Sequence, residues 1–510
     1  MEQVKRKGRL GKKDGLMAFA FLLLLCLASF LFLSVFSYFT TPFSTCDNGR
    51  DAAFFRLVGQ GMTKGHLPYR DFFDMKGPFL FFIEYTGQRL SYGRLGIFIL
   101  QWLNLFLTLL LICRIFSRCG VLNRLLQIGL LLPLAFVASF TFEGGNLTEE
   151  FSLIPIFSCL LLSLSFFEMS EKGNEFWQMR MFRCAGAWFG FCFGLLLMIR
   201  VTNAALICAM VFVVLISLTK DRKYRQLGVC AGMFIVGLLL SLLPTVWYYS
   251  RKGLLNDLLN AVFVLGFRYS EEKTFGQHMT EMILGNRRQL LLLLAVPCGI
   301  PLLLRWKTWR ERLLVISGAL FTFFAVASGN NYTHYYTLAI PLIVLCEIAA
   351  ADSLQTKIDK RGVIAAVLAV IMLLSQASVF KLYLMRAYSH LFRQDSYHTA
   401  QDVKDVSSRI PEEDYGSVYC YNIEPAWYTY ADLFPCIKYC GWQNHYIALM
   451  PEIYDDLKRT FEDSPPAWLV LPEYLGSIPS FLEERLGKDY RISYENESYI
   501  LYHYTGQHSG

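Results

Sequence analysis

Long uninterrupted runs of apolar residues dominate this chain and restrict what it can fold into. The first run covers residues 15–39, GLMAFAFLLLLCLASFLFLSVFSYF, and exceeds the roughly 20 residues that a helix needs to cross about 30 Å of hydrocarbon. Of the 510 residues, 54% are hydrophobic and only 17% are charged, which is outside the range of an ordinary soluble domain. The sequence therefore predicts a membrane protein with several spanning helices.

Ten further apolar segments follow the first, so we expect a mainly α-helical, polytopic chain with about eleven transmembrane helices. The ten segments lie at residues 94–116, 121–141, 151–168, 184–200, 202–219, 226–249, 290–305, 313–329, 335–350 and 363–384. Residues 184–219 are too many for one crossing and too few for two full ones, and Arg200 and Asn203 interrupt them. We expect two short helices that meet at a sheltered polar turn, because a lone arginine in lipid is costly.

Clusters of basic residues indicate the topology of the chain. The positive-inside rule makes the basic intervals cytoplasmic, at residues 1–15, 117–124, 220–225, 305–312 and 351–361. A transmembrane core at residues 16–385 then has outer loops at 40–93, 142–150, 250–289 and 330–334. The third of these loops is an exception to the rule, because it contains four basic residues, Arg251, Lys252, Arg287 and Arg288. Long translocated loops follow the positive-inside rule poorly.

The basic start of the chain, MEQVKRKGRLGKKDG, would also suit a secretory signal peptide. The apolar stretch that follows is longer than the roughly 7 to 15 residues of such a signal, and no small-residue cleavage site precedes Cys46. An uncleaved anchor with a cytoplasmic N-terminus is the preferred interpretation. The net charge of +7 is spread over short clusters instead of one basic stripe, so we expect no nucleic-acid partner.

The composition becomes that of a soluble domain near His390. Candidate strands SVYCYN and AWLVLPE alternate with candidate helices PEIYDDLKRTFE and IPSFLEERLG, and YRISYENESYILYHY is typical of a closing hairpin. This alternation predicts a small extracytoplasmic α/β domain at residues 386–510. Within it, the aromatic segment EPAWYTYADLFP would suit stacking on sugar rings, but a helix core is the preferred interpretation. A disulfide among Cys420, Cys436 and Cys440 is left open.

The first outer loop contains several charged residues of the types that take part in catalysis. It reads CDNGRDAAFFRLVGQGMTKGHLPYRDFFDMKGP and contains Asp47, Asp51, Arg70, Asp71, Asp74 and Lys76. Carboxylates at a membrane boundary can deprotonate an acceptor hydroxyl, while Lys and Arg can hold a phosphate. A solvated loop that pairs its own charges is the alternative. The following segment, PFLFFIEYTGQRLSY, is apolar but short, which predicts a helix lying on the outer interface.

Two further outer loops carry polar side chains next to helix ends. TFEGGNLTEEFSL brings Glu143, Glu149 and Glu150 to the start of a helix, where carboxylates also serve simply as caps. SGNNYTHYYTLAIP packs hydrogen-bonding and stacking groups into one turn, at Asn330, Asn331, Tyr332, His334 and Tyr335. Such groups suit a sugar or a phosphate, and an interfacial aromatic belt is the alternative.

These motifs together carry a resemblance to a known family. They are Asp51-x-x-Phe54, Gly65-x-x-Pro68-Tyr69-Arg70-Asp71 and Asp74-x-Lys76-Gly77-Pro78, followed by an acidic outer loop and a Tyr-x-His-Tyr turn. The pattern resembles the GT-C glycosyltransferases of family 39, and it looks closest to their bacterial dolichyl-phosphate-mannose mannosyltransferase-like members. The resemblance covers the layout of roughly residues 15–385, and its sharp motifs lie in the first outer loop.

The resemblance implies a membrane core that takes a sugar from a polyprenyl phosphate and passes it, usually with inversion, to an envelope acceptor on the outer side. The acceptor class stays open between protein, lipid and glycopolymer. By this resemblance Asp51 is the general base, with Asp47 as the fallback, and Lys76 meets the donor phosphate. The family's Lys-Pro-Pro is Lys76-Gly77-Pro78 here, a departure that affects the geometry expected around the lysine.

The remaining expected site residues follow from the chemistry of such a transfer. A leaving phosphate needs cations, which we expect from Lys76, Arg70, Arg200 and His334. Glu149 or Glu150 would share the catalytic site. Contacts to substrate are expected from Asp47, Asp71, Asp74, Tyr69, Asn331 and Tyr335. No metal-ligand spacing and no nucleotide-binding GxxxxGK[ST] loop occur, so no cofactor is predicted, although a divalent metal is left open.

Two other functions are alternatives to glycosyl transfer. A lipid or glycan transporter or flippase would also have many helices, but transporters place charge near the midplane and often show inverted repeats. The acids of this chain gather in outer loops instead. A non-catalytic envelope assembly factor is the second alternative, and the presence of Asp51 and Lys76 argues against it.

Overall fold

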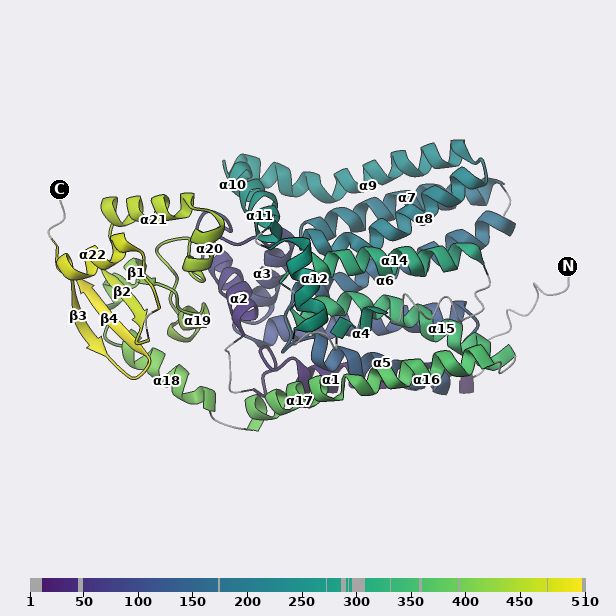
Figure 1. Cartoon of the computed structure of the whole chain (residues 1–510), viewed down its shortest axis with the longest axis horizontal. Coiled ribbons are helices and arrows are strands. Elements are labelled where there is room, and N and C mark those ends of the chain that lie inside the picture. Colours follow the sequence, from purple (N-terminus) through teal and green to yellow (C-terminus); the bar gives the residue numbers. More distant parts are fainter. Residues whose placement is uncertain are drawn as a thin grey trace.

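A computed structural model describes residues 12–506, apart from 45–48, 173–174, 272, 286–289, 292, 296–307, 331, 357–359, 393–394 and 475. It has two parts, a long helical bundle and a smaller domain packed against one end of it (Figure 1). The predicted architecture, mainly α-helical with a terminal α/β domain, is confirmed.

Within the described residues, eight segments are helical, long and apolar enough to cross a membrane. They belong to α1 (Lys12–Phe36), α4 (Leu95–Arg118), α5 (Arg124–Thr141), α6 (Thr148–Lys172), α7 (Glu175–Leu197), η1 with α8 (Val201–Ala204, Ala205–Lys220), α9 (Tyr224–Arg251), and η3 with α15 (Thr333–Ala339, Ile340–Thr356). The break between α7 and α8 lies at Arg200, where a polar turn was predicted.

Three predicted spans have no counterpart among these eight. Residues 313–327 of one predicted span lie in α14 (Trp309–Ala327), and residues 363–384 are divided between α16 (Lys360–Ser375) and α17 (Ala377–Phe392). The predicted span at 290–305 falls mostly outside the described residues.

Short helices lie at or near the end of the bundle that faces the terminal domain (Figure 1). They are α2 (Arg50–Thr63), α3 (Pro78–Leu90), α10 (Leu255–Leu259), the π-helical η2 (Asn260–Leu265), α11 (Gly266–Glu271) and α12 (Phe275–Leu284). The helix predicted after Pro78 is confirmed as α3, and its proline occupies the first turn, where a missing N–H breaks no intrahelical hydrogen bond. Its position on the membrane interface stays a prediction.

The terminal domain contains a four-stranded sheet in the order β1-β2-β4-β3. The strands are β1 (Val418–Cys420), β2 (Trp468–Pro472), β3 (Tyr490–Glu495) and β4 (Tyr499–Tyr504), with β1 parallel to β2 and β4 antiparallel to both of its neighbours. The helices are α18 (Asp395–Ser407), η4 (Glu412–Ser417), α19 (Ala426–Ala431), α20 (Gln443–Leu449), α21 (Glu452–Asp463) and α22 (Ser480–Lys488). Both predicted strands, both predicted helices and the hairpin are present.

Packing explains why this domain folds as predicted. Ile453, Leu457 and Phe461 recur every four residues along α21 and are all buried, which is the pattern of an amphipathic helix covering a core. Trp427 and Tyr428 of the aromatic segment are also buried, in agreement with the preferred helix-core interpretation. Cys420, Cys436 and Cys440 form no disulfide.

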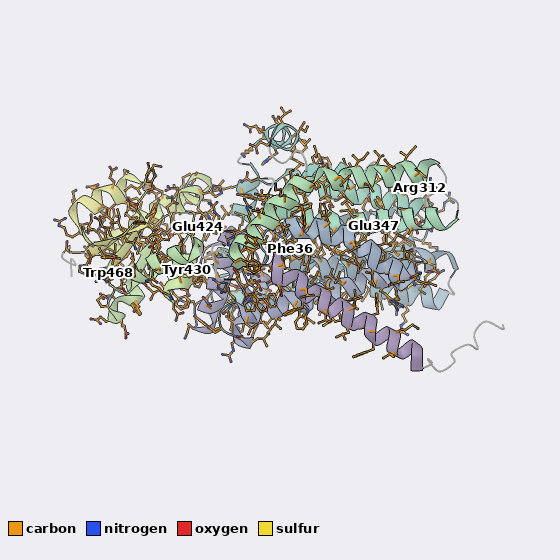
Figure 2. All side chains as sticks on the ribbon, turned by 90° about the horizontal axis from the view of Figure 1, so that it is seen from below. Phe36, Arg312, Glu347, Glu424, Tyr430 and Trp468 are labelled. Carbon is orange, nitrogen blue, oxygen red and sulfur yellow. The ribbon has the colours of Figure 1, made fainter. Side chains whose placement is uncertain are left out.

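Polar contacts attach the terminal domain to the segment of residues 50–92, which contains α2 and α3. The backbone N–H of Phe73 donates to the carbonyl of Lys438 at 2.9 Å, and the Tyr92 hydroxyl donates to Asp432 at 2.8 Å. Arg50 at the start of α2 pairs with Glu424 at 2.8 Å. Figure 2 shows Glu424 near the border with the bundle and Arg312 at the opposite end of the helical part.

Candidate active site

A cavity of about 550 Å³ lies where the bundle meets the terminal domain. Its charged and imidazole side chains come from α2, the loops after α2, α5 and α7, η3, α17 and α20. They are Arg50, Asp51, Lys76, Glu143, Arg200, His334, Arg386, His390 and His445. Five predicted site residues line this one cavity, although they are far apart in the sequence: Asp51, Lys76, Arg200, His334 and Tyr335.

Backbone hydrogen bonds place Lys76 beside Arg200. The N–H of Gly77 donates to the carbonyl of Ile199 at 2.9 Å, which joins the loop that carries Lys76 to the turn that carries Arg200. A Cβ atom on Gly77 would lie 2.2 Å from the carbonyl oxygen of Met198, so only glycine allows the two backbones to approach this closely.

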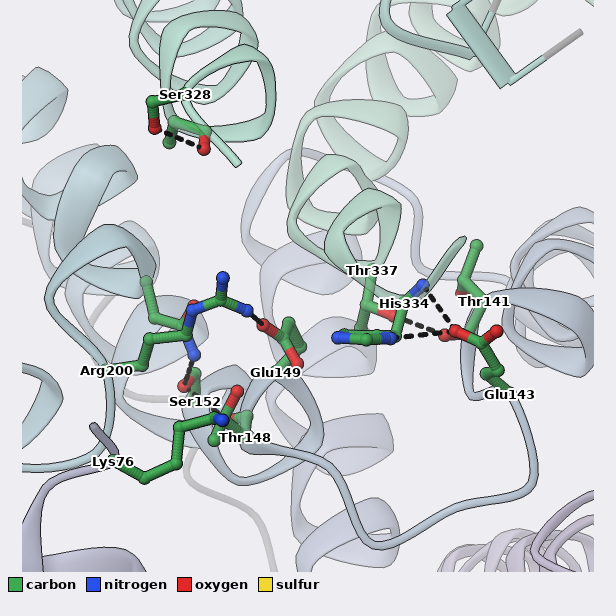
Figure 3. A network of polar contacts seen from close by, with 12 residues as sticks. Lys76, Thr141, Glu143, Thr148, Glu149, Ser152, Arg200, Ser328, His334 and Thr337 are labelled. Carbon is green, nitrogen blue, oxygen red and sulfur yellow. Dashed lines mark hydrogen bonds and ion pairs between the residues drawn. The ribbon is translucent and has the colours of Figure 1, made fainter. Parts of the chain in front are cut away.

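Arg200 is held by one carboxylate and one aromatic ring. Its guanidinium donates to Glu149 Oε1 at 2.9 Å, as Figure 3 shows, and lies 3.9 Å from the centroid of the Tyr335 ring. Both contacts favour the charged guanidinium at a largely buried position. Arg200 therefore provides a fixed positive charge at the cavity wall.

Lys76, like Arg200, is held by one carboxylate and one aromatic ring. Its Nζ lies 3.6 Å from Asp74 Oδ1 and 5.6 Å from the centroid of the Phe55 ring. Burial alone would lower the pKa of Lys76, but the nearby carboxylates of Asp74 and Asp51 outweigh burial and raise the pKa above its usual value. Lys76 is therefore a second cation that stays protonated at neutral pH.

The ion pair of Arg200 leads to a prediction about stability. Glu149 is 1% exposed, and within the described part of the chain its second oxygen has no hydrogen-bond partner. Removing one member of a buried ion pair typically costs about 3–5 kcal/mol, because the other charge is left uncompensated. We expect Glu149→Gln to lower the thermal unfolding midpoint of the purified protein, as measured by differential scanning fluorimetry.

Glu168→Gln is the matched control for this prediction. Glu168 pairs with Arg118, but its side chain is 57% exposed, and exposed pairs contribute about 0–1 kcal/mol. An unfolding midpoint that falls no further for Glu149→Gln than for Glu168→Gln would contradict the role given to Glu149.

Asp51 lies in the first turn of α2 and lines the cavity, half-buried. A carboxylate is favoured there by the partial positive charge of the helix N-terminus. The side chain of Asp51 makes no hydrogen bond or ion pair with any residue that the structure describes, so both of its oxygens can accept a hydrogen bond from a hydroxyl group. The fallback base, Asp47, is outside the described residues.

Glu143, in the loop between α5 and α6, lines the cavity. Its Oε2 lies 2.7 Å from His334 Nδ1 and accepts the backbone N–H of His334 at 3.3 Å, while Oε1 accepts the Tyr383 hydroxyl at 3.0 Å (Figure 3 shows the contacts with His334). A carboxylate at Nδ1 sets the orientation and the tautomer of the imidazole ring.

The two acids in the first turn of α6, Glu149 and Glu150, point elsewhere. Glu149 contacts Arg200, as described above, and neither Glu149 nor Glu150 lines the cavity. Glu150 accepts a hydrogen bond from the Gln101 side chain at 2.9 Å and one from the backbone N–H of Leu147 at 3.2 Å. Glu150 thus stabilises the start of α6, which agrees with the capping alternative.

Four further predicted residues organise the loop between α2 and α3 instead of lining the cavity. Arg70 and Asp71 pair with each other at 2.7 Å, so here the loop does pair its own charges. The Tyr69 hydroxyl donates to the carbonyl of Lys76 at 2.8 Å, and Asp74 contacts Lys76 as described. Burial raises the pKa of Asp74, and Lys76 opposes this effect. Asn331 is outside the described residues.

Several lining residues were not predicted from the sequence. Arg386 and His390 lie one helical turn apart on α17, so they share a face, but no local motif marks them. Trp442, His445 and Tyr446 come from the terminal domain, and Tyr269 from α11. Within the described residues, no group of three His, Cys, Asp or Glu side chains could hold a metal ion.

A second cavity of about 270 Å³ adjoins the first and shares Met75, Arg200 and Tyr269 with it. The rest of its lining is mostly apolar and comes from η1, η2, α11 and the end of α14, including Val201, Val262, Phe263 and Phe267. Arg200 therefore lies on the wall that the two cavities share.

Comparison with solved structures reveals the fold. No protein-family model matches the sequence, and no curated protein matches it. The crystal structure of ArnT from Cupriavidus metallidurans bound to undecaprenyl phosphate is similar, with a TM-score of 0.56 at 14% identity over 95% of this chain and 98% of ArnT. The apo structure of the same protein gives a TM-score of 0.55 at 13% identity over 96% and 98% of the two chains. The chain is thus a multi-pass membrane protein with the fold of ArnT along nearly its whole length.

Proposed function

We propose that this protein is a membrane glycosyltransferase that moves a sugar from a polyprenyl-phosphate donor to an acceptor of the cell envelope. The observation that carries the proposal is the position of Lys76 and Arg200, which lie side by side at a cavity that also contains the carboxylate of Asp51. Two cations suit the phosphate of the donor, and the adjoining apolar cavity suits the first isoprene units. A chain of the same fold, ArnT, has been crystallised with undecaprenyl phosphate.

The proposed reaction is a single displacement at the anomeric carbon of the sugar. The acceptor hydroxyl attacks that carbon, and the bond between the carbon and the phosphate oxygen breaks. The electron pair leaves on the phosphate, where Lys76 and Arg200 stabilise the negative charge. The hydroxyl proton passes to the carboxylate of Asp51. One displacement of this kind inverts the configuration of the anomeric carbon.

Glu143 and His334 complete the proposed site. They are held together at 2.7 Å on the cavity wall, where Glu143 takes the place that the sequence interpretation gave to Glu149 or Glu150. Their contact fixes the imidazole, so that it can position the sugar or the acceptor by hydrogen bonding.

We place the reaction on the extracytoplasmic side of the membrane. The terminal domain packs against the end of the bundle that carries the cavity, and Arg312, from a predicted cytoplasmic cluster, lies at the opposite end (Figure 2). The positive-inside rule supports this orientation, with the N-terminus in the cytoplasm.

Donor consumption by the purified protein tests the proposed function. The full chain, reconstituted in lipid nanodiscs, is mixed with undecaprenyl phosphates that carry radiolabelled hexoses or pentoses, together with envelope extract as the acceptor source. We expect release of undecaprenyl phosphate and transfer of label to the extract. A transporter or an assembly factor would leave every donor intact, and that result would overturn the proposal.

A further inference from the structure

Trp442 has an unfavourable backbone conformation at the edge of the active-site cavity. Its φ of 53° and ψ of 32° lie in the left-handed region, which residues with a bulky side chain rarely adopt. Such conformations persist only where the surrounding structure enforces them, and they concentrate at ligand sites. The residue stands directly before α20 in the terminal domain.

The neighbouring Gln443 enforces this conformation. Gln443 is completely buried, and its amide oxygen accepts the backbone N–H of Asn422 at 2.8 Å. Its amide nitrogen donates to the carbonyls of Tyr439 at 2.7 Å and Cys420 at 2.9 Å. These hydrogen bonds tie the turn to β1 and to the segment before it, so Trp442 cannot relax without breaking buried hydrogen bonds.

The indole of Trp442 is directed towards the catalytic end of α2. Its ring centroid lies 5.9 Å from that of Phe54, which is three residues after Asp51 and therefore on the same side of the helix. The indole lines the cavity and is only half-buried, although it packs on one side against Phe54 and Tyr446. A large apolar surface thus stays open towards the space beside Asp51.

The terminal domain is also connected to the proposed phosphate site. The Tyr446 hydroxyl donates to Asp74 Oδ1 at 3.3 Å, and the same oxygen lies 3.6 Å from Lys76 Nζ. The adjacent residue of α20, His445, packs its ring at 5.8 Å against that of Tyr269, which lines both cavities. Trp442 is therefore held at a fixed position relative to both Asp51 and Lys76.

We propose that Trp442 is a specificity residue that stacks on a carbohydrate ring beside Asp51, so that the terminal domain supplies one wall of the active site. This inference rests on the proposed function. The C–H face of a pyranose or furanose ring is apolar and matches the face of an indole, whereas the ring hydroxyls at its edge reach polar groups. The stacked ring belongs either to the sugar of the donor or to a sugar of the acceptor.

Three variants in the full chain test this role: Trp442→Ala, Trp442→Phe, and Trp247→Ala as a matched control on α9, where the indole is exposed and lines neither cavity. We expect transfer by Trp442→Ala to fall at least about tenfold, transfer by Trp442→Phe to stay within about threefold of wild type, and the control to be unchanged. Binding of undecaprenyl phosphate without a sugar should be the same in all of them.

Donor binding then separates the two sources of the stacked ring. If the ring is the donor sugar, Trp442→Ala binds undecaprenyl-phosphate glucose or mannose more weakly than wild type. If the ring belongs to the acceptor, donor binding is unchanged and only transfer falls. Wild-type transfer by Trp442→Ala would overturn the inference, as would equal losses in Trp442→Ala and Trp442→Phe. Failure of the wild-type protein to consume any donor would instead overturn the proposed function.

Discussion

Replacing Asp51 with Asn is expected to lower the rate of sugar transfer by about 10²–10⁴-fold, the usual contribution of a general base. Asparagine has nearly the same shape as aspartate but cannot accept the proton of the acceptor hydroxyl. Donor affinity should change little, because Lys76 and Arg200 are left in place. The measurement is radiolabel transfer at saturating donor, together with binding of undecaprenyl phosphate.

Asp455→Asn provides the matched control, because Asp455 is exposed on α21 and does not line the cavity. Its transfer rate should equal that of wild type. Full activity in Asp51→Asn would remove Asp51 from the mechanism, and loss of activity in Asp47→Asn would then assign the base to Asp47.

Replacing Lys76 with Gln is expected to have the second large effect, a fall in transfer of about 10²–10³-fold together with weaker binding of undecaprenyl phosphate. The lysine would stabilise the phosphate both in the bound donor and as the leaving group. Because the pKa of Lys76 is raised, its charge should persist to a pH above the normal lysine range, and donor binding should not decline at mildly alkaline pH through this group. Scintillation proximity binding across pH measures both effects.

A structural explanation for the Lys76 effect can be separated from a chemical one. Lys76→Gln leaves Asp74 buried without its cation, so the double variant with Asp74→Asn removes that unpaired charge. We expect the double variant to recover thermal stability but not transfer. Lys458→Gln, an exposed lysine on α21, serves as the surface control. Recovery of transfer in the double variant would assign Lys76 a purely structural role.

The fold could be predicted largely because its signals are local. Most apolar runs predict one helix each in the described part of the chain, and the polar break at Arg200 predicts the turn between α7 and α8. The strands and helices of the terminal domain follow from periodicity within a few residues, as in α21. Residues 363–384 show the limit of this approach, because hydropathy gave one span where the structure has two helices meeting near Gln376.

The candidate site was harder to predict, because it depends on the direction in which each side chain points. Glu143, Glu149 and Glu150 lie within eight residues of the sequence. Hydropathy does not show which of these side chains faces the cavity. Glu143 has a positive φ of 49° and precedes two glycines that also have positive φ, so the chain turns sharply and points this acid at the cavity. Glu149 and Glu150 have entered α6, whose geometry directs them to Arg200 and Gln101 instead.

Trp442 was missed for a different reason. No motif in its local sequence marks Trp442 as a binding residue. The aromatic segment around Trp427, whose composition would also suit stacking on sugars, is buried in the core. The role of Trp442 depends on how the terminal domain docks against α2, through contacts such as the one between Phe73 and Lys438, which lie more than 300 residues apart. Single-sequence patterns carry no information about such a long-range interface.

The contact of Gly77 with Met198 has a consequence for how the protein would bind a charged lipid. Since the two backbones touch and share a hydrogen bond, Lys76 and Arg200 belong to one rigid unit. The spacing between the two charges is set during folding, before any lipid arrives. An incoming phosphate would meet a preorganised receptor, so little binding energy would be lost in arranging it, and the same electrostatic field would act unchanged when the sugar departs.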